Sequence, residues 1–130
     1  MAKNGGTVSK ILAIDDDNTT LQLLDFFLTK HKYEVTVASN GVDGIKKAQE
    51  IMPDLILLDV MMPNMDGIDV CKKLRADEKT AKIPILFLSA LSQDIEIMRG
   101  LMAGSDGYIV KPFEPDNLLE SIEKLVEKGA

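Results

Sequence analysis

Five short apolar runs divide the chain, and a stretch with helical spacing follows each of them. The runs occupy residues 11–14, 34–38, 55–58, 85–88 and 108–110. The first, third and fourth runs are apolar at every position, whereas a half-exposed strand would alternate between apolar and polar residues. Continuous apolar runs are typical of parallel strands that are covered on both faces. The pattern therefore predicts five largely buried strands.

The intervening segments carry helix signals. Leu21, Leu24 and Leu28 repeat with helical spacing, and capping residues and turn formers mark the helix ends. Asn18 or Thr19 is the predicted N-cap of the first helix, and Ser39 or Asn40 is predicted to open the second. The other helices are predicted to begin near Gly67, near Asp94 and at Pro115. The third ends near Ala76, the fourth near Ala103 with Gly104 as C-cap, and the fifth near Lys128.

This alternation predicts an α/β fold of (βα)₅ type, with a doubly wound five-stranded parallel sheet. The natural strand order is the flavodoxin-like 2-1-3-4-5, in which the first and third strands are neighbours. We expect one domain over residues 9–128, a flexible leader at 1–8 and a C-terminal tail at 129–130. Ligands of such sheets bind outside the carboxyl ends of the strands.

Polar residues stand at four of these carboxyl ends. Asp15 and Asp16 follow the first strand, Asp59 the third, Ser89 the fourth and Lys111 the fifth. Because a parallel sheet places these ends along one edge, we expect the five side chains to meet. Each residue alone has an ordinary explanation as a helix cap or a turn residue. Their joint placement on inner strand ends indicates a site.

The chemistry of this set favours a metal ion and a phosphoryl group. Three carboxylates packed together repel one another, and a divalent cation would relieve that repulsion. Oxygen ligands suit Mg²⁺, or Mn²⁺ in its place, and no His or Cys lies nearby in sequence to indicate zinc. The Lys111 ammonium and the Ser89 hydroxyl could receive phosphoryl oxygens, and a carboxylate can serve as the nucleophile.

Four ordered segments carry a family resemblance. They are residues 11–16, 53–67, 87–90 and 108–113, with the sequences ILAIDD, PDLILLDVMMPNMDG, FLSA and YIVKPF. These segments closely resemble the receiver domain of bacterial and archaeal two-component response regulators, the CheY-like family. The similarity extends over residues 9–128.

The resemblance implies a phosphoacceptor switch rather than a conventional enzyme. Asp59 would accept a phosphoryl group from the phosphohistidine of a sensor histidine kinase or a histidine phosphotransfer protein. Asp15, Asp16, Asp59 and the backbone carbonyl of Met61 would bind Mg²⁺. Lys111 and Ser89 would bind the phosphoryl group.

The resemblance also implies how the switch works. Movement of Ser89 would let the Tyr108 ring turn inward and alter the face formed by the fourth helix, fifth strand and fifth helix. That face would control a downstream effector protein or output domain, and Ile97 on the fourth helix is a candidate contact. The bond between Lys111 and Pro112 is expected to be cis. We expect a monomer that can dimerise on phosphorylation.

Some positions depart from common family forms. Ser89 stands where Thr is frequent, which keeps the hydroxyl. Asn64 stands where Gly is frequent, so an αL conformation is expected there. Met61 and Leu91 are apolar where some fast-cycling members carry polar groups, which predicts slow self-dephosphorylation.

Two other functions remain open. A receiver-like module could bind partners without phosphorylation. A haloacid-dehalogenase-type phosphatase could use Asp15 as nucleophile and Asp17 as acid/base, since the segment from Asp15 to Thr19 contains D-x-D-x-T. Against the phosphatase, the chain lacks a later Gly-Asp-x-x-x-Asp motif and has no room for a cap domain. A mononucleotide binder is disfavoured because no Gly-rich loop follows the first strand.

The composition of the chain argues against two classes of binding partner, nucleic acids and membranes. A net charge of −6 argues against direct nucleic-acid binding, which depends on basic residues. The absence of a long apolar run argues against membrane insertion.

With a single cysteine, Cys71, and no signal-peptide pattern, we expect a cytoplasmic protein with Cys71 as a buried structural thiol. The seven methionines are predicted to fill the core. The chain is interpreted as a free-standing switch or a receiver excised from a longer protein.

Overall fold

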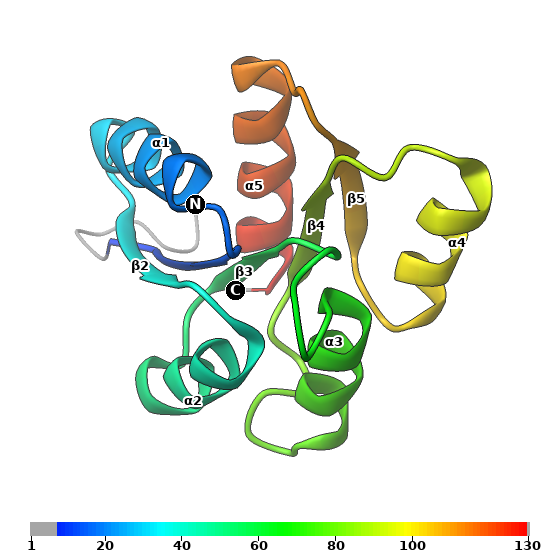
Figure 1. Cartoon of the computed structure of the whole chain (residues 1–130). Coiled ribbons are helices and arrows are strands. Elements are labelled where there is room, and N and C mark those ends of the chain that lie inside the picture. Colours follow the sequence, from blue (N-terminus) through cyan, green and yellow to red (C-terminus); the bar gives the residue numbers. More distant parts are fainter. Residues whose placement is uncertain (1–7, 130) are drawn as a thin grey trace.

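Five strands and five helices alternate along the chain in a computed structural model that describes residues 8–129, with side chains described for residues 8–127 (Figure 1). The elements are β1 (Lys10–Ile14), α1 (Asn18–Lys30), β2 (Glu34–Ala38), α2 (Gly41–Ile51), β3 (Leu55–Leu58), α3 (Gly67–Ala76), β4 (Ile85–Ser89), α4 (Asp94–Met102), β5 (Gly107–Val110) and α5 (Pro115–Gly129). The predicted leader falls outside the described residues except for Val8, and Ala130 also lies outside them. Within the described part, no helix is long and apolar enough to cross a membrane.

The strands form one parallel sheet in the order β2-β1-β3-β4-β5, which confirms the predicted topology. The register aligns the carboxyl ends of the inner strands. Ile14 at the end of β1 pairs with both Ala38 of β2 and Leu58 of β3, and Ser89 of β4 pairs with Val110 of β5. The residues that follow these strands are therefore delivered to one edge of the sheet.

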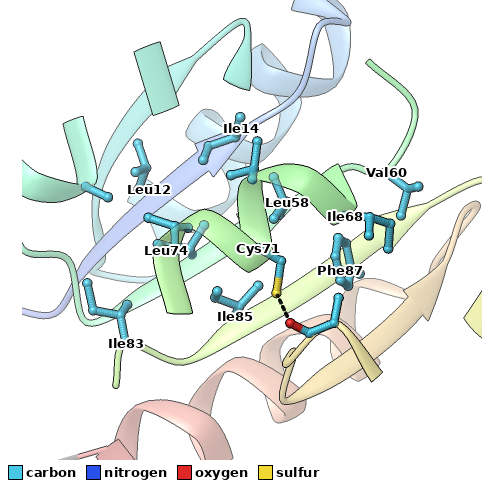
Figure 2. Packing of buried hydrophobic residues seen from close by; sticks show 14 of the residues in the cluster. Leu12, Ile14, Leu58, Val60, Ile68, Cys71, Leu74, Ile83, Ile85 and Phe87 are labelled. Carbon is cyan, nitrogen blue, oxygen red and sulfur yellow. Dashed lines mark hydrogen bonds between the residues drawn. The ribbon is translucent and has the colours of Figure 1, made fainter. Parts of the chain in front are cut away.

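Each face of the sheet is covered by its own hydrophobic core. Leu12 and Ile14 of β1 face a core shared with α2 and α3, whereas Ile11 and Ala13 face the opposite core under α1 and α5. Successive side chains of a strand point to opposite faces, so a strand covered on both sides must be apolar throughout. Figure 2 shows the first core, where Cys71 of α3 lies among side chains of β1, β3 and β4. Cys71 is fully buried, as predicted.

The cap of α1 differs from the prediction. Asp17, rather than Asn18 or Thr19, is the N-cap, because its backbone is still extended (φ −92°, ψ 107°). Its carboxylate accepts hydrogen bonds from the Thr19 backbone N–H at 3.1 Å and from the Thr20 hydroxyl at 2.8 Å. The cap of α2 is Asn40, one of the two predicted residues.

The C-terminal end of α4 also lies one residue from its predicted place. Ala103 is the C-cap, and Gly104 follows it with a φ of +113°. A glycine is favoured there because positive φ is strained for residues with a Cβ atom. In the loop after β3, Asn64 has a φ of 71°, which confirms the expected left-handed conformation.

The methionine prediction was wrong. Of the six methionines in the described part of the chain, only Met62 is buried, and Met65 is partly buried against the core. The exposed methionines are Met52, Met61, Met98 and Met102. Met52 and Met61 lie outside the helices, and Met98 and Met102 lie on α4, of which only Gly100 is buried.

Candidate functional site

Three carboxylates converge at the carboxyl edge of the sheet. Asp15 and Asp16 follow β1, and Asp59 follows the neighbouring strand β3. One ligand oxygen from each lies within 4.8 Å of the others. Asp15 and Asp59 are buried, with 3% and 8% of their surface exposed, whereas Asp16 is exposed. The cluster therefore has a buried base and one side open to solvent.

Backbone hydrogen bonds continue the sheet into this cluster. The Asp15 N–H donates to the Ala38 carbonyl at 3.1 Å, and the Asp59 N–H donates to the Ile14 carbonyl at 3.0 Å. The Asp15 carboxylate also accepts the Asp17 N–H at 3.0 Å. Both buried carboxylates thus project from backbone that the sheet itself holds in place.

Lys111 brings a cation to the two buried carboxylates. Its Nζ donates to Asp15 Oδ2 at 2.8 Å and lies 4.0 Å from Asp59 Oδ2. The Lys111 backbone N–H donates to the Ser89 carbonyl at 2.8 Å, and the bond between Lys111 and Pro112 is cis. One ammonium therefore faces two buried negative charges.

The excess of negative charge at the site affects the pKa of Asp59. Burial, and then the neighbouring charge of Asp15, raise the pKa of Asp59 to about 6. The Lys111 ammonium, a hydrogen bond from the Met61 backbone N–H and a hydrogen bond with Ser89 oppose that rise. Two close carboxylates disfavour each other's ionised form, and desolvation adds to the effect. A further cation beside Asp59 would consequently stabilise its ionised form.

The oxygen-only donor set fits a hard divalent cation. The three carboxylates lie within 4.8 Å of one another, and the cluster contains no histidine or cysteine. A cation here would neutralise the two buried charges that Lys111 leaves only partly balanced. Mg²⁺ matches such a set because it takes a few carboxylates and keeps several waters.

Ser89, Leu91 and Tyr108 form a chain of hydrogen bonds beside the cluster. Ser89 is fully buried, and its Oγ accepts the Leu91 N–H at 3.2 Å. The Tyr108 hydroxyl donates to the Leu91 carbonyl at 2.8 Å. The loop between β4 and α4 is therefore bonded on both sides, by one residue from β4 and one from β5.

Gly67 meets a positional requirement that was not predicted from the sequence. A Cβ atom placed on Gly67 would lie 2.1 Å from the Asp59 carbonyl oxygen and 2.8 Å from the Val60 Cα. The Gly67 N–H also donates to the Val60 carbonyl at 2.8 Å. The available signal was a glycine directly after Asp66, the N-cap of α3. Gly67 lets the start of α3 pack against the backbone that carries Asp59.

The structure brings together Asp15, Asp16, Asp59 and Lys111, with Ser89 bonded to the Lys111 backbone. Met61 is 57% exposed, two residues after Asp59. Ile97 lies on α4, outside the cluster, and is partly buried.

The known proteins that are similar to this chain are response regulators. The sequence model described as "Response regulator receiver domain" matches residues 11–123. The chain is 40% identical over 119 residues to the DNA-binding dual master transcriptional regulator RpaA of Synechocystis, covering 92% of this chain and 49% of that protein. It is 40% identical over 120 residues to the Bacillus subtilis alkaline phosphatase synthesis regulator PhoP, with the same coverage of 92% and 49%. The chain thus spans about half the length of these curated relatives.

Solved structures with similar sequences superpose closely on this chain. The Vibrio cholerae chemotaxis protein CheY4 superposes with a TM-score of 0.86 at 33% identity, covering 92% of this chain and 99% of that one. A CheY-like response regulator receiver domain protein from Methanospirillum hungatei superposes with a TM-score of 0.88 at 27% identity, covering 95% and 97%.

Proposed function

Since this chain belongs to the response regulator receiver domain family of two-component systems, we propose that it is a switch that accepts a phosphoryl group on Asp59. The observation that carries the proposal is the position of Asp59 itself. It is buried beside Asp15, it lies 4.0 Å from the Lys111 ammonium, and its pKa is raised to about 6. A carboxylate held in this way is a nucleophile whose attack on phosphorus would be assisted by nearby positive charge.

The donor would be a phosphohistidine on a sensor histidine kinase or a histidine phosphotransfer protein. In the step, an Asp59 carboxylate oxygen forms a bond to phosphorus while the phosphorus–nitrogen bond to the donor imidazole breaks, and the electron pair of that bond stays with the histidine. Lys111 would stabilise the negative oxygens of the transferred group, and the Ser89 hydroxyl would donate a hydrogen bond to one of them. The chain is then a phosphoacceptor that promotes its own modification and slowly loses it.

The carboxylates of Asp15, Asp16 and Asp59, together with the backbone carbonyl of Met61, would hold Mg²⁺ or Mn²⁺. When bound, the ion supplies charge neutralisation for the phosphoryl oxygens. Asp16 would complete the set from the solvent side, since it is the exposed member of the cluster.

Phosphorylation would be read out through Ser89 and Tyr108. Both bond to Leu91 at the start of the segment that leads into α4. A change at Ser89 would thereby alter the face formed by α4, β5 and α5, which includes Ile97. That face would bind a downstream effector protein or output domain, or a second copy after phosphorylation. If Ile97 contributes, an Ile97→Glu variant keeps its phosphorylation and loses partner binding.

Intact mass measurement with a small phosphodonor tests the function. The purified protein is incubated with acetyl phosphate with and without Mg²⁺, and the adduct is mapped. We expect a single adduct that needs Mg²⁺, is absent in Asp59→Asn and is reduced in Asp15→Asn and Asp16→Asn. Glu120→Gln, an exposed carboxylate on α5, serves as the control and should behave as wild type. No adduct, even with a cognate kinase, would instead favour a module that works by binding alone.

An adduct on Asp15 would support the phosphatase alternative, which the contacts disfavour. The Asp15 carboxylate is engaged by Lys111 and by the Asp17 N–H. The Asp17 carboxylate, which that mechanism needs as acid/base, caps α1 through Thr19 and Thr20.

A further inference from the structure

Arg75 of α3 bonds to two other segments, the loop that follows α3 and a loop about 30 positions further along the chain. Its Nε donates to the Gly104 carbonyl at 2.8 Å, and Nη2 forms an ion pair with Asp106 Oδ2 at 2.9 Å. Its Nη1 donates to the carbonyls of Ala81 and Ile83 at 3.1 and 2.7 Å. The side chain is only 22% exposed. The planar guanidinium thus connects the C-terminal end of α3 both to the loop before β4 and to the loop after α4.

Further contacts hold the same end of α4. The Cys71 thiol, one turn before Arg75 on α3, donates to the Ala103 carbonyl at 3.5 Å (Figure 2). Asp106 Oδ2 also accepts the Ile85 N–H at 2.9 Å, and the Asp106 N–H donates to the Ile85 carbonyl at 2.8 Å. The segment 103–106 is therefore bonded both to α3 and to the first residue of β4.

The N-terminal end of α4 is held differently. Its cap residue, Gln93, makes no side-chain capping bond, and Gly100 is the buried residue of the helix. A Cβ atom on Gly100 would lie 3.0 Å from the Tyr108 ring, so the C-terminal half of the helix packs against that ring. The preceding loop is bonded at Leu91, to Ser89 and to Tyr108. Figure 1 shows α4 beside β5, at the end of the sheet away from β2.

We propose that α4 is a hinged helix whose C-terminal end is a fixed pivot held by Arg75 and Cys71. The N-terminal end of α4 is the part that moves when Asp59 is phosphorylated. Two hydrogen bonds attach this end at Leu91, whose side chain also packs against the core. One of the two bonds comes from Ser89, which borders the cluster around Asp59. The C-terminal attachments come from α3 and from Ile85 of β4, and they include neither Ser89 nor the carboxylates of the cluster. Arg75 is then a positioning residue that confines the response of α4 to its N-terminal part and the preceding loop, residues 90–98. This inference rests on the proposed function for its trigger, whereas the pivot itself is a property of the unphosphorylated protein.

Amide hydrogen exchange, followed by mass spectrometry, tests the pivot. In the unphosphorylated wild type, peptides covering 99–107 should exchange about tenfold more slowly than those covering 90–98, because local opening follows the density of such anchoring contacts. Arg75→Met should raise exchange in 99–107 by a similar factor. The control is Lys73→Met, which removes an exposed cation from the same helix and should leave exchange there unchanged. If Arg75→Met fails to fold, Arg75→Lys replaces it, because a lysine keeps the charge but cannot reproduce the four-acceptor fork.

The trigger is tested on the same samples after treatment with Mg²⁺ and acetyl phosphate, with intact mass confirming the adduct. Of these two segments, the wild type should change its exchange in 90–98 alone, and Arg75→Met should spread the change into 99–107. The proposal is overturned if 99–107 changes as much as 90–98 in the wild type, or if Arg75→Met behaves as Lys73→Met. Absence of an adduct contradicts the proposed function instead, and the unphosphorylated comparison then decides the pivot.

Discussion

The ammonium of Lys111 lies 2.8 Å from a carboxylate oxygen of Asp15, although 96 positions separate the two residues in the chain. The pair is buried on the Asp15 side, where 5% of the side chain is exposed, and 21% of the Lys111 side chain is exposed. Lys111 is thus bonded directly to one buried carboxylate and lies only within Coulombic reach of the other, Asp59. Lys111 therefore leaves Asp59 without a direct bond to its ammonium, yet it remains close enough to stabilise negative charge added there.

Removal of this cation should move the titration of Asp59 upward. Lys111 lowers the pKa of Asp59 against the raising effects of burial and of Asp15. In metal-free Lys111→Met, that pKa should therefore rise above its value of about 6. Carbon-13 NMR of the labelled aspartate carboxyls measures it directly. Lys46→Met, an exposed lysine of α2, should leave the titration unchanged. A fall in the Asp59 pKa would contradict the assigned geometry.

Asp59 should also destabilise the metal-free protein at neutral pH. Its pKa is about 6 in the folded state against an ordinary 3.8, so the folded protein binds the proton more tightly than the unfolded chain. The favourable contribution of the protonated carboxyl is present below about pH 4 and is lost as pH rises through about 6. Asp59→Asn should therefore exceed wild type in free energy of unfolding by about 3 kcal/mol at pH 7.5, since each pKa unit corresponds to about 1.4 kcal/mol.

Urea denaturation in EDTA at pH 4 and pH 7.5 checks this difference. The two proteins should converge at the lower pH, where the carboxyl is protonated. Equal stabilities at pH 7.5 would show that Asp59 is not held unfavourably in the fold.

Gly67→Ala should be severely destabilising. The new Cβ would meet the Asp59 carbonyl oxygen and the Val60 Cα, and both are backbone atoms that cannot rotate away. Overpacking of this kind costs about 3 kcal/mol or more, and it should also displace Asp59 and slow adduct formation. Gly100→Ala is the matched comparison, since its Cβ would meet the Tyr108 and Phe87 rings at 3.0–3.1 Å. Its smaller loss of stability, about 1 kcal/mol, would follow from the freedom of side chains to shift.

Self-dephosphorylation should be slow because Met61 and Leu91 offer no polar side chain to orient an attacking water. Met61 is exposed beside the site, so a polar replacement there can reach solvent. Met61→Asn should shorten the lifetime of the adduct by about tenfold, a modest part of what a positioned polar group can contribute. The decay of the adduct mass after removal of phosphodonor measures this lifetime. Met102→Asn, an exposed methionine on α4, should decay as wild type does. A wild-type half-life of only seconds would refute the interpretation.

The sequence by itself determined the fold class and the membership of the site. Residues 11–14, 55–58 and 85–88 are apolar at every position, and such strands can only be accommodated in a sheet covered on both sides. Parallel strands in turn bring the residues after them to one edge, so the sequence alone predicts that Asp15, Asp59, Ser89 and Lys111 lie together.

Tertiary structure alone decided how these groups act on one another. Periodicity does not carry distances between residues, so it could not show that Lys111 bonds Asp15 rather than Asp59, or that the pKa of Asp59 is raised. The anchoring of α4 by Arg75 was equally hidden, because three of its acceptors are backbone carbonyls, which every residue possesses. Burial, electrostatic coupling and close backbone approach arise between segments distant in sequence, and their strength depends on distances that only the folded chain defines.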